Sequence, residues 1–380
     1  MAEFTPSGKC PHKFLDVAAA FSENFEKAAD PVAELGASFA VLIDGEVVID
    51  LWHGHGDRKK EVTWAEDTLP CIYSSGKAVL ATLVARAVSD GVMDYARPIA
   101  ADWPEFGQGG KGKITLEQAL SHQAGLCGFP DEMNPADWLN WEAICKRLEQ
   151  QEPLWEPGTK NGYHPQTIGF IAGEVFRRQM GASVGEVIRR DYFDPQGIDL
   201  HCGIKDDAVA ARTVEMIKPN RPPDLGPLTE FKEIAFLKKW SQPGRVDAHE
   251  WLAAELPASN MHATAVGLAG IVHPLACNGE CQSGHAIDGA VVADVFRPRI
   301  SGEDLVLPFK MTWGAGLMRN PDGAFGPIAE VWGHAGSGGS AVIVDPERRL
   351  TAAYVMNRMS PYLVGDPRAR RLFGALYGAL

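Results

Sequence analysis

The sequence predicts an α+β fold, with an antiparallel sheet that is built from both ends of the chain and flanked by helices. Near the start, strand-like runs at 38–43 and 46–52 flank Asp44-Gly45, which is the strongest short-range signal of a hairpin. The pattern from about 167 to 275 is mostly helical. Strand-like runs then return at 312–318, 341–344 and 351–356.

This distribution predicts how the chain is divided. We expect residues 1–97 and 290–380 to form one discontinuous α/β domain, and residues 98–289 to form a mainly helical domain inserted into it. A cleft is expected between the two parts, and small ligands usually bind at such junctions.

Three helices are predicted in the terminal parts. Amphipathic spacing predicts the first over 14–28. The second begins at Ser74 and ends near Gly91, and its surface is almost entirely apolar from 78 to 88, so it should be buried. The third closes the chain, with apolar side chains on one side at Ala369, Leu372, Phe373, Leu376 and Leu380.

Composition limits the class of protein. The chain has 380 residues, of which 45% are hydrophobic and 22% charged, which is typical of a folded soluble protein. Its net charge of −13 argues against nucleic acid or an anionic membrane as a partner. The N-terminus lacks an apolar signal region and no stretch is long enough to span a membrane, so we expect a cytoplasmic protein. Composition leaves the oligomeric state open.

The cysteines favour reduced thiols. There are seven, scattered along the chain, and an odd number does not fit a disulfide framework. Cys277 and Cys281 are close in sequence, with His273 and His285 nearby, but no second cysteine pair completes a zinc site. We expect two free thiols in a surface loop, and no metal or cofactor.

The first candidate for chemistry is Ser74-Ser75-Gly76-Lys77 at the start of the buried helix. Ser74 and Lys77 are at i and i+3, so the hydroxyl and the amine lie on one face, whereas Ser75 points elsewhere. A buried lysine needs a paired charge or a lowered pKa, and a lowered pKa is what a serine-activating base requires. The alternative is a serine helix cap followed by a lysine that reaches solvent.

Two further stretches are candidates. Tyr163 follows Pro157-Gly158-Thr159 in a loop, and a phenol held near a lysine ammonium can lose its proton below its usual pKa and act as a base. The alternative is a tyrosine that packs its ring over a loop. In the stretch 332–340, the glycine density lets the backbone approach a ligand and offers N–H groups to an oxyanion, unless the glycines only form a bulge.

Two residues favour structural interpretations. Residues 114–122 predict a helix with Thr115 as N-cap, and His122 in its last turn is favourably placed by the helix dipole whether or not it touches a site. Gly181-Ala182-Ser183-Val184-Gly185 matches the G-x-S-x-G nucleophile elbow, but that elbow must follow a strand. A helix precedes this stretch, and Ser183 with Glu186 three residues on predicts a capping box.

Taken in order, these motifs resemble the class C β-lactamase and penicillin-recognising serine hydrolase superfamily, and within its fold most closely the family VIII carboxylesterases. The resemblance rests on Ser-x-x-Lys at 74–77, Tyr163 after Pro-Gly-Thr, and His-x-Gly at 334–336. It also covers 120–126, 260–265 and 336–346, and so spans about residues 38 to 360. It implies a β-lactamase or DD-peptidase-like fold.

The resemblance also implies roles. Ser74 would be the acylated nucleophile, Lys77 its activator, and Tyr163 the base that shuttles the proton. The backbone N–H groups of Ser74 and Ser337 would form an oxyanion hole. His334 would take the position of the lysine in the Lys-Thr-Gly triplet, and Trp332 and Gly336 would line the substrate site.

Two departures from the β-lactamases favour esters as substrates. A histidine stands at position 334 where they have a fixed positive charge, which weakens an anion site. Their Tyr-x-Asn reads Tyr163-His164-Pro165, so no asparagine amide is present. The sequence thus predicts a serine hydrolase of small, short-chain carboxylic esters. The alternatives are β-lactamase or D-amino-acid peptidase activity, and a non-catalytic binding relative.

Overall fold

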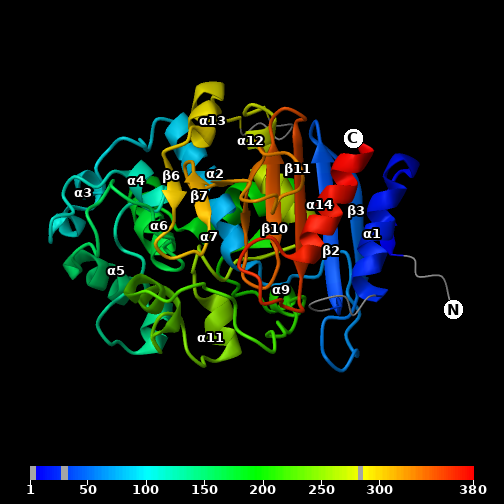
Figure 1. The fold of residues 1–380 in the computed structure, drawn as a ribbon, viewed down its shortest axis with the longest axis horizontal. Helices are drawn as coiled ribbons and strands as arrows, with labels where there is room; N and C mark the ends of the chain where they lie inside the picture. The colour runs from blue at the N-terminus through cyan, green and yellow to red at the C-terminus, as the bar shows by residue number, and fades with distance from the viewer. Residues whose placement is uncertain (1–5, 27–32, 281–285) are drawn as a thin grey trace.

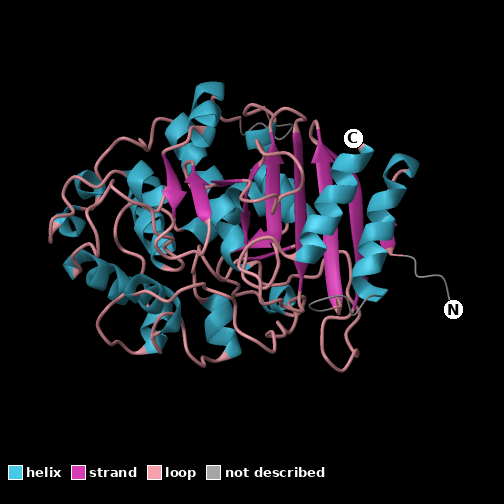
Figure 2. Cartoon of the chain, viewed as in Figure 1, coloured by secondary structure: helices cyan, strands magenta, loops and turns pink. Residues whose placement is uncertain are grey.

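The computed structural model describes residues 6–26, 33–280 and 286–380. A nine-stranded antiparallel sheet runs through the molecule in the order β1-β3-β2-β11-β10-β9-β8-β7-β6 (Figures 1 and 2). The strands are β1 (Ser7–Lys9), β2 (Gly36–Ile43), β3 (Glu46–Gly54), β6 (Ile300–Glu303), β7 (Lys310–Trp313), β8 (Met318–Arg319), β9 (Trp332–Ala335), β10 (Ala341–Asp345) and β11 (Leu350–Met356).

The sheet is thus built from both ends of the chain, as predicted. The first hairpin joins the last strand, with Met356 opposite Ala37 and Leu350 opposite Ile43. The hairpin turn falls at Asp44-Gly45, and both residues have positive φ, 52° and 86°. The predicted fold class is confirmed, whereas the domain limits at 97/98 and 289/290 remain a prediction.

Helices cover both faces of the sheet. On one face, α1 (Leu15–Glu26) and α14 (Pro367–Ala379) lie side by side (Figure 1). On the other are α2 (Gly76–Ser89) and α12 (Ala265–Ala276). Because side chains alternate along a strand, Phe39 of β2 packs in the core beneath α1 and α14, and Ala40 packs in the core beneath α2 and α12.

The middle of the chain is mainly helical. It also contains a two-stranded sheet, β4 (Leu200–His201) with β5 (His262–Ala263). The remaining α-helices are α3 (Ile99–Asp102), α4 (Leu116–Leu120), α5 (Trp141–Gln150), α6 (Thr167–Met180), α7 (Val184–Ile188), α8 (Asp194–Gln196), α9 (Asp207–Ala210), α10 (Glu230–Lys232), α11 (Ala248–Ala253) and α13 (Gly289–Phe296).

Three local predictions need correction. The strand expected over 312–318 is two strands, β7 and β8, because the chain turns at Gly314 and Gly316, and Gly316 has φ 84°. Strand β1 at the sheet edge was not predicted, since three residues carry no period. The helix expected from Ser74 begins as a 3₁₀ turn, η2 (Tyr73–Ser75), and becomes α-helical at Gly76.

Within the described residues, no helix is long and apolar enough to cross a membrane.

Candidate active site

Ser74 lies in the 3₁₀ turn that leads into the buried helix α2. The preceding residue, Tyr73, has φ 46°, a left-handed conformation that a tyrosine rarely adopts. Its hydroxyl contacts the sulfur of Met359 at 3.6 Å, which anchors the side chain of this strained residue. The turn leaves Ser74 half-buried, while Ser75 is fully buried and bonded to Ser340.

Lys77 points from the first turn of α2 to Ser74. Its Nζ lies 3.0 Å from Ser74 Oγ, 2.8 Å from the carbonyl oxygen of Pro165 and 2.9 Å from that of Ala258. The residue is only 4% exposed. The predicted burial of Lys77 and its contact with Ser74 are therefore confirmed, and the alternative of a lysine in solvent is wrong.

The surroundings of Lys77 favour a neutral amine. Burial lowers its pKa well below the usual 10.5. A neutral amine has two N–H donors and one lone pair. If the carbonyls of Pro165 and Ala258 accept the two N–H bonds, the lone pair faces Ser74 Oγ and can accept its proton.

Tyr163 contacts Ser74 through a side-chain hydrogen bond. Its ring is 5.0 Å from Lys77 Nζ and stacks on Trp313 with 5.9 Å between centroids and 8° between planes. Burial raises the pKa of Tyr163 above its usual value, although a hydrogen bond with Ser74 opposes the rise. The predicted lowering of this pKa is wrong: the phenol is buried, and Lys77 is not a fixed cation beside it.

A buried carboxylate holds the Tyr163 loop in place. Asp304 Oδ1 accepts hydrogen bonds from the backbone N–H groups of Tyr163, Val306 and Leu307, each at 2.9 Å. Asp304 Oδ2 accepts from Asn161 Nδ2 at 2.8 Å. Sequence reasoning missed Asp304, because one acidic residue ahead of a short apolar run carries no pattern.

Two histidines connect the Tyr163 loop to the segment after α4. His164 Nε2 accepts from the Leu126 N–H at 2.9 Å, and its Nδ1 donates to the carbonyl of Gly162 at 2.6 Å. His122 Nδ1 accepts from the His164 N–H at 3.2 Å. Burial lowers the pKa of His164 to about 3 and that of His122 well below 6.5, so both are neutral.

The dipole interpretation of His122 is therefore wrong. The capping box of Thr115 and Gln118 is present, but α4 ends at Leu120 and His122 follows it with φ 62°. Its ring lies 4.8 Å from that of Tyr163 and 4.3 Å from that of Trp313. A neutral histidine gains nothing from a helix dipole, and here it supports the Tyr163 side of the site.

His334 is fully buried in β9. Its Nδ1 donates to the carbonyl of Ala335 at 2.9 Å, so Nε2 carries the lone pair, and this Nε2 is buried without a hydrogen-bond partner among the described residues. Burial, together with nearby Lys77, lowers the pKa of His334 to about 3. The residue is thus a neutral acceptor and not a cation.

The glycine-rich turn after β9 packs against the serine turn. Ser340 Oγ donates to the carbonyl of Ile72 at 2.7 Å and lies 3.1 Å from Ser75 Oγ. A side chain at Gly336 would come within 2.4 Å of the Ile72 carbonyl and 3.2 Å of the Ser75 amide. The glycine therefore permits close approach of the two backbones, and Ser337 follows it at an exposed position.

Two further residues were singled out from the sequence. Trp332 is buried, with its ring 5.9 Å from that of Phe296 on α13, and its place in the substrate site remains a prediction. Ser183 caps α7 through a capping box with Glu186, as predicted, so the G-x-S-x-G match is not a nucleophile elbow.

The cysteine prediction needs partial correction. Cys277 is 2% exposed and follows α12, with Sγ 3.1 Å from His273 Nε2, so it is not in a surface loop. Cys281 and His285 lie outside the described residues. Within the described residues, no group of three potential ligands could hold a metal ion.

With the site defined, comparison with known proteins identifies the family. A family model described as Beta-lactamase matches residues 21–375. The chain belongs to the beta-lactamase family. A solved structure of a penicillin-binding protein homolog from Caulobacter crescentus is similar to this beta-lactamase family member, with 45% identity, 99% and 100% of the two chains covered and a TM-score of 0.95.

Two further relatives of this family member are named as esterases. A family VIII carboxylesterase shares 35% identity with a TM-score of 0.90, and the alignment covers 99% of this chain and 100% of the other. The Esterase/beta-lactamase LipL of Mycobacterium tuberculosis (strain ATCC 25618 / H37Rv) is 30% identical over 87% of this chain and 79% of its own. The predicted resemblance and the predicted enzyme class, a serine hydrolase, are confirmed.

Proposed function

We propose that this protein hydrolyses small, short-chain carboxylic esters through an acyl-enzyme on Ser74. The observation that carries the proposal is the set of three contacts around Lys77 Nζ, in which two carbonyls fix the amine and the third neighbour is Ser74 Oγ. The names of two relatives, a carboxylesterase and an esterase/beta-lactamase, support the same chemistry.

In acylation, Ser74 Oγ attacks the ester carbonyl carbon and its proton moves to the lone pair of Lys77. The backbone N–H groups of Ser74 and Ser337 stabilise the negative charge on the carbonyl oxygen. As the tetrahedral intermediate collapses, the alkoxide leaves and takes a proton from the Tyr163 phenol, which the Lys77 ammonium replaces. The protonated state of Tyr163 suits this role as a donor.

In deacylation, water attacks the acyl group on Ser74. The Tyr163 phenol takes the proton of the water as it passes its own proton to the neutral Lys77 amine, and the lysine then returns a proton to Ser74 Oγ, so the enzyme regains its starting state. No cofactor or metal takes part in this scheme.

The state of His334 favours an uncharged substrate. A neutral side chain with an unpartnered lone pair offers no attraction to a carboxylate, and it can accept a hydrogen bond from a donor. We therefore propose esters that carry no carboxylate as the preferred substrates. β-Lactam hydrolysis is the second candidate, favoured by the esterase/beta-lactamase named among the relatives.

The experiment compares hydrolysis of p-nitrophenyl butyrate and of a chromogenic cephalosporin by wild type, Ser74→Ala and Ser183→Ala. We expect wild type and Ser183→Ala to cleave the ester alike, and Ser74→Ala to lose about 10³-fold or more in kcat. A fluorophosphonate probe should label the first two proteins only. Turnover that survives Ser74→Ala and is lost in Ser183→Ala would refute the assignment.

We also propose a cytoplasmic location. Among the described residues, Cys71, Cys127, Cys145 and Cys202 are free and buried, which suits a reducing compartment.

A further inference from the structure

The turn that carries Ser337 is held from behind by a buried arginine. Gly338 and Gly339 have φ 91° and 124°, so the turn depends on left-handed backbone that only glycine adopts easily. Two internal hydrogen bonds close it, from the Gly336 N–H to the Ser340 carbonyl at 2.7 Å and from the Gly339 N–H to the Gly336 carbonyl at 3.1 Å.

The carbonyl of Gly338 points away from the turn and accepts two hydrogen bonds. One comes from the Ser360 N–H at 2.9 Å, and the other from Arg368 Nη2 at 3.0 Å. Arg368 lies near the start of α14 and is only 3% exposed. The start of α14 therefore contacts the glycine-rich turn, which packs against the turn that carries Ser74.

All five N–H donors of the Arg368 guanidinium are used. Nε and Nη2 donate to the Asp366 carboxylate at 3.1 and 2.8 Å. Nη1 donates to Glu34 Oε2 at 3.0 Å and to the Arg358 carbonyl at 2.8 Å, and Nη2 also donates to Gly338. A lysine has three donors on a single nitrogen and cannot reproduce this planar arrangement.

The arginine stays charged although it is buried. Burial opposes its charge, but Glu34 and Asp366 outweigh that effect and raise the pKa of Arg368. Burial also raises the pKa of Glu34, to about 8, so the hydrogen bonds of Arg368, and not a pair of full charges, fix its position. The guanidinium is thus a permanent cation with fixed partners. A side chain at Gly339 would come within 2.4 Å of Asp366 Oδ2 and 2.9 Å of Arg368 Nη2, so glycine is required for this approach.

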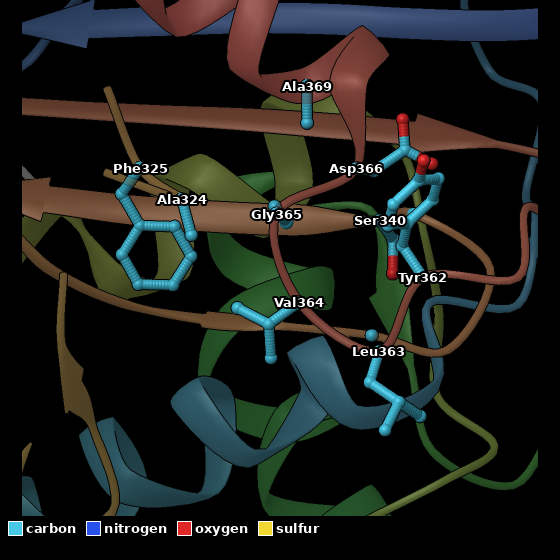
Figure 3. A pocket seen from close by; sticks show the side chains of 13 residues that line it. Ala324, Phe325, Ser340, Tyr362, Leu363, Val364, Gly365, Asp366 and Ala369 are labelled. Carbon is cyan, nitrogen blue, oxygen red and sulfur yellow. The ribbon is translucent and has the colours of Figure 1, made fainter. Parts of the chain in front are cut away.

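A small cavity separates part of the turn from the segment before α14. A cavity of about 10 Å³, roughly the space of one water molecule, lies between the turn and the segment 362–366 (Figure 3). Figure 3 shows Asp366 and Ser340 on the same side of this cavity. Gly338 does not line this cavity but packs against Met359, and the hydrogen bonds from Arg368 and Ser360 add to that contact in holding the Gly338 carbonyl.

We propose that Arg368 is a positioning residue for the oxyanion hole: by holding the Gly338 carbonyl, it fixes the turn so that the Ser337 N–H points to the substrate oxygen. This inference rests on the proposed function, in which the Ser337 N–H is one oxyanion donor. Arg368 itself does not touch the substrate, and it acts only through the turn.

The test measures a property that a purely structural arginine would not change. Wild type, Arg368→Gln and Arg368→Lys are assayed on an ester and on its thiono analogue, in which sulfur replaces the carbonyl oxygen. Sulfur accepts hydrogen bonds poorly, so the preference of an enzyme for the oxygen ester reports how well its oxyanion donors are placed. Turnover of the oxygen ester by wild type tests the proposed function separately.

We expect Arg368→Gln to lower kcat for the oxygen ester about 10- to 100-fold with KM changed less than about 3-fold, because the lost interaction acts in the transition state. The rate on the thiono ester should fall much less, so the oxygen preference shrinks. Arg368→Lys should show the same effect in milder form, and it keeps the test valid if Arg368→Gln does not fold.

Arg299→Gln is the matched control. Arg299 has a side chain only 2% exposed, donates to Glu117 and Asp294, and directly precedes β6, the strand at the edge of the sheet opposite β1. Its loss should lower thermal stability and leave the oxygen preference unchanged. If oxygen and thiono rates of the Arg368 variants fell in parallel, or stayed within about 2-fold of wild type, the proposal would be overturned.

Discussion

The carboxylate of Asp304 accepts a hydrogen bond from the backbone N–H of Tyr163 at 2.9 Å, across 141 positions of sequence. This contact ties the loop before α6 to the segment between β6 and β7. Tyr163 has no helix or strand of its own, so its place beside Ser74 depends on such contacts.

Asp304 also accepts a hydrogen bond from Asn161 Nδ2, and exchange of these two side chains tests how Asp304 supports the Tyr163 loop. In Asp304→Asn, the new side-chain NH₂ group takes the place of Oδ2 and faces Asn161 Nδ2, so that two donors oppose each other. We expect kcat to fall about 10-fold or more, and the free energy of unfolding to fall by about 1–3 kcal/mol. The double variant Asn161→Asp/Asp304→Asn restores one donor and one acceptor and should recover part of both. Measurement of kcat and of urea unfolding for the four proteins forms a double-mutant cycle. Equal losses in the single and double variants would contradict the prediction.

The pH profile of wild type should reveal Lys77 as a base. Only the neutral amine accepts the serine proton, so kcat/KM should rise with pH through the pKa of Lys77, which burial places well below 10.5. Lys77→Arg puts a permanent cation in the place of the neutral amine and has no titratable base, and we expect it to be at least about 10³-fold less active at every pH. An Arg variant that recovered activity at high pH would exclude this role.

A charge at position 334 should change substrate preference. His334→Lys is expected to raise kcat/KM for an ester that bears a carboxylate about 10-fold relative to a neutral ester, because the native side chain is a neutral acceptor. His334→Gln, which adds no charge at the same place, is the control. The ratio of the two kcat/KM values is the measurement. Similar ratios for both variants would show that this residue does not select substrate charge.

Acid should unfold the protein through its buried histidines. Burial lowers the pKa of His164 from 6.5 to about 3, so between these values the unfolded chain binds more protons than the folded chain. The contribution of neutral His164 to the free energy of unfolding is fully present above about pH 6.5 and is lost as the pH falls toward 3. In His164→Gln, the slope of unfolding free energy against pH in this window should decrease by up to about 1.4 kcal/mol per pH unit. Urea unfolding from pH 4 to 7 measures it, and an unchanged slope would argue against a neutral buried His164.

The sequence was most informative where chemistry depends on local spacing. The proximity of Ser74 and Lys77 follows from one helical turn, and the capping role of Ser183 follows from one capping box. The hairpin at Asp44-Gly45 and the closing helix were predicted for the same reason, because both patterns are local.

Long-range contacts were not predictable in this way. Asp304 and Arg368 act on residues far away in sequence, and neither belongs to a motif. The state of Tyr163 was predicted wrongly, because the sequence showed a nearby lysine but not the burial that raises the pKa of the phenol and lowers that of the amine.

The order of strands has a consequence for synthesis of the protein on the ribosome. Strand β2 pairs on one side with β3, its neighbour in sequence, but on the other side with β11, which is synthesised much later. Helix α1 likewise packs beside α14, which follows β11 in sequence. The hairpin of β2 and β3 therefore emerges with one edge unpaired and one face uncovered until β11 and α14 have been made. Truncation of the last helix should leave a nascent sheet that aggregates or recruits chaperones.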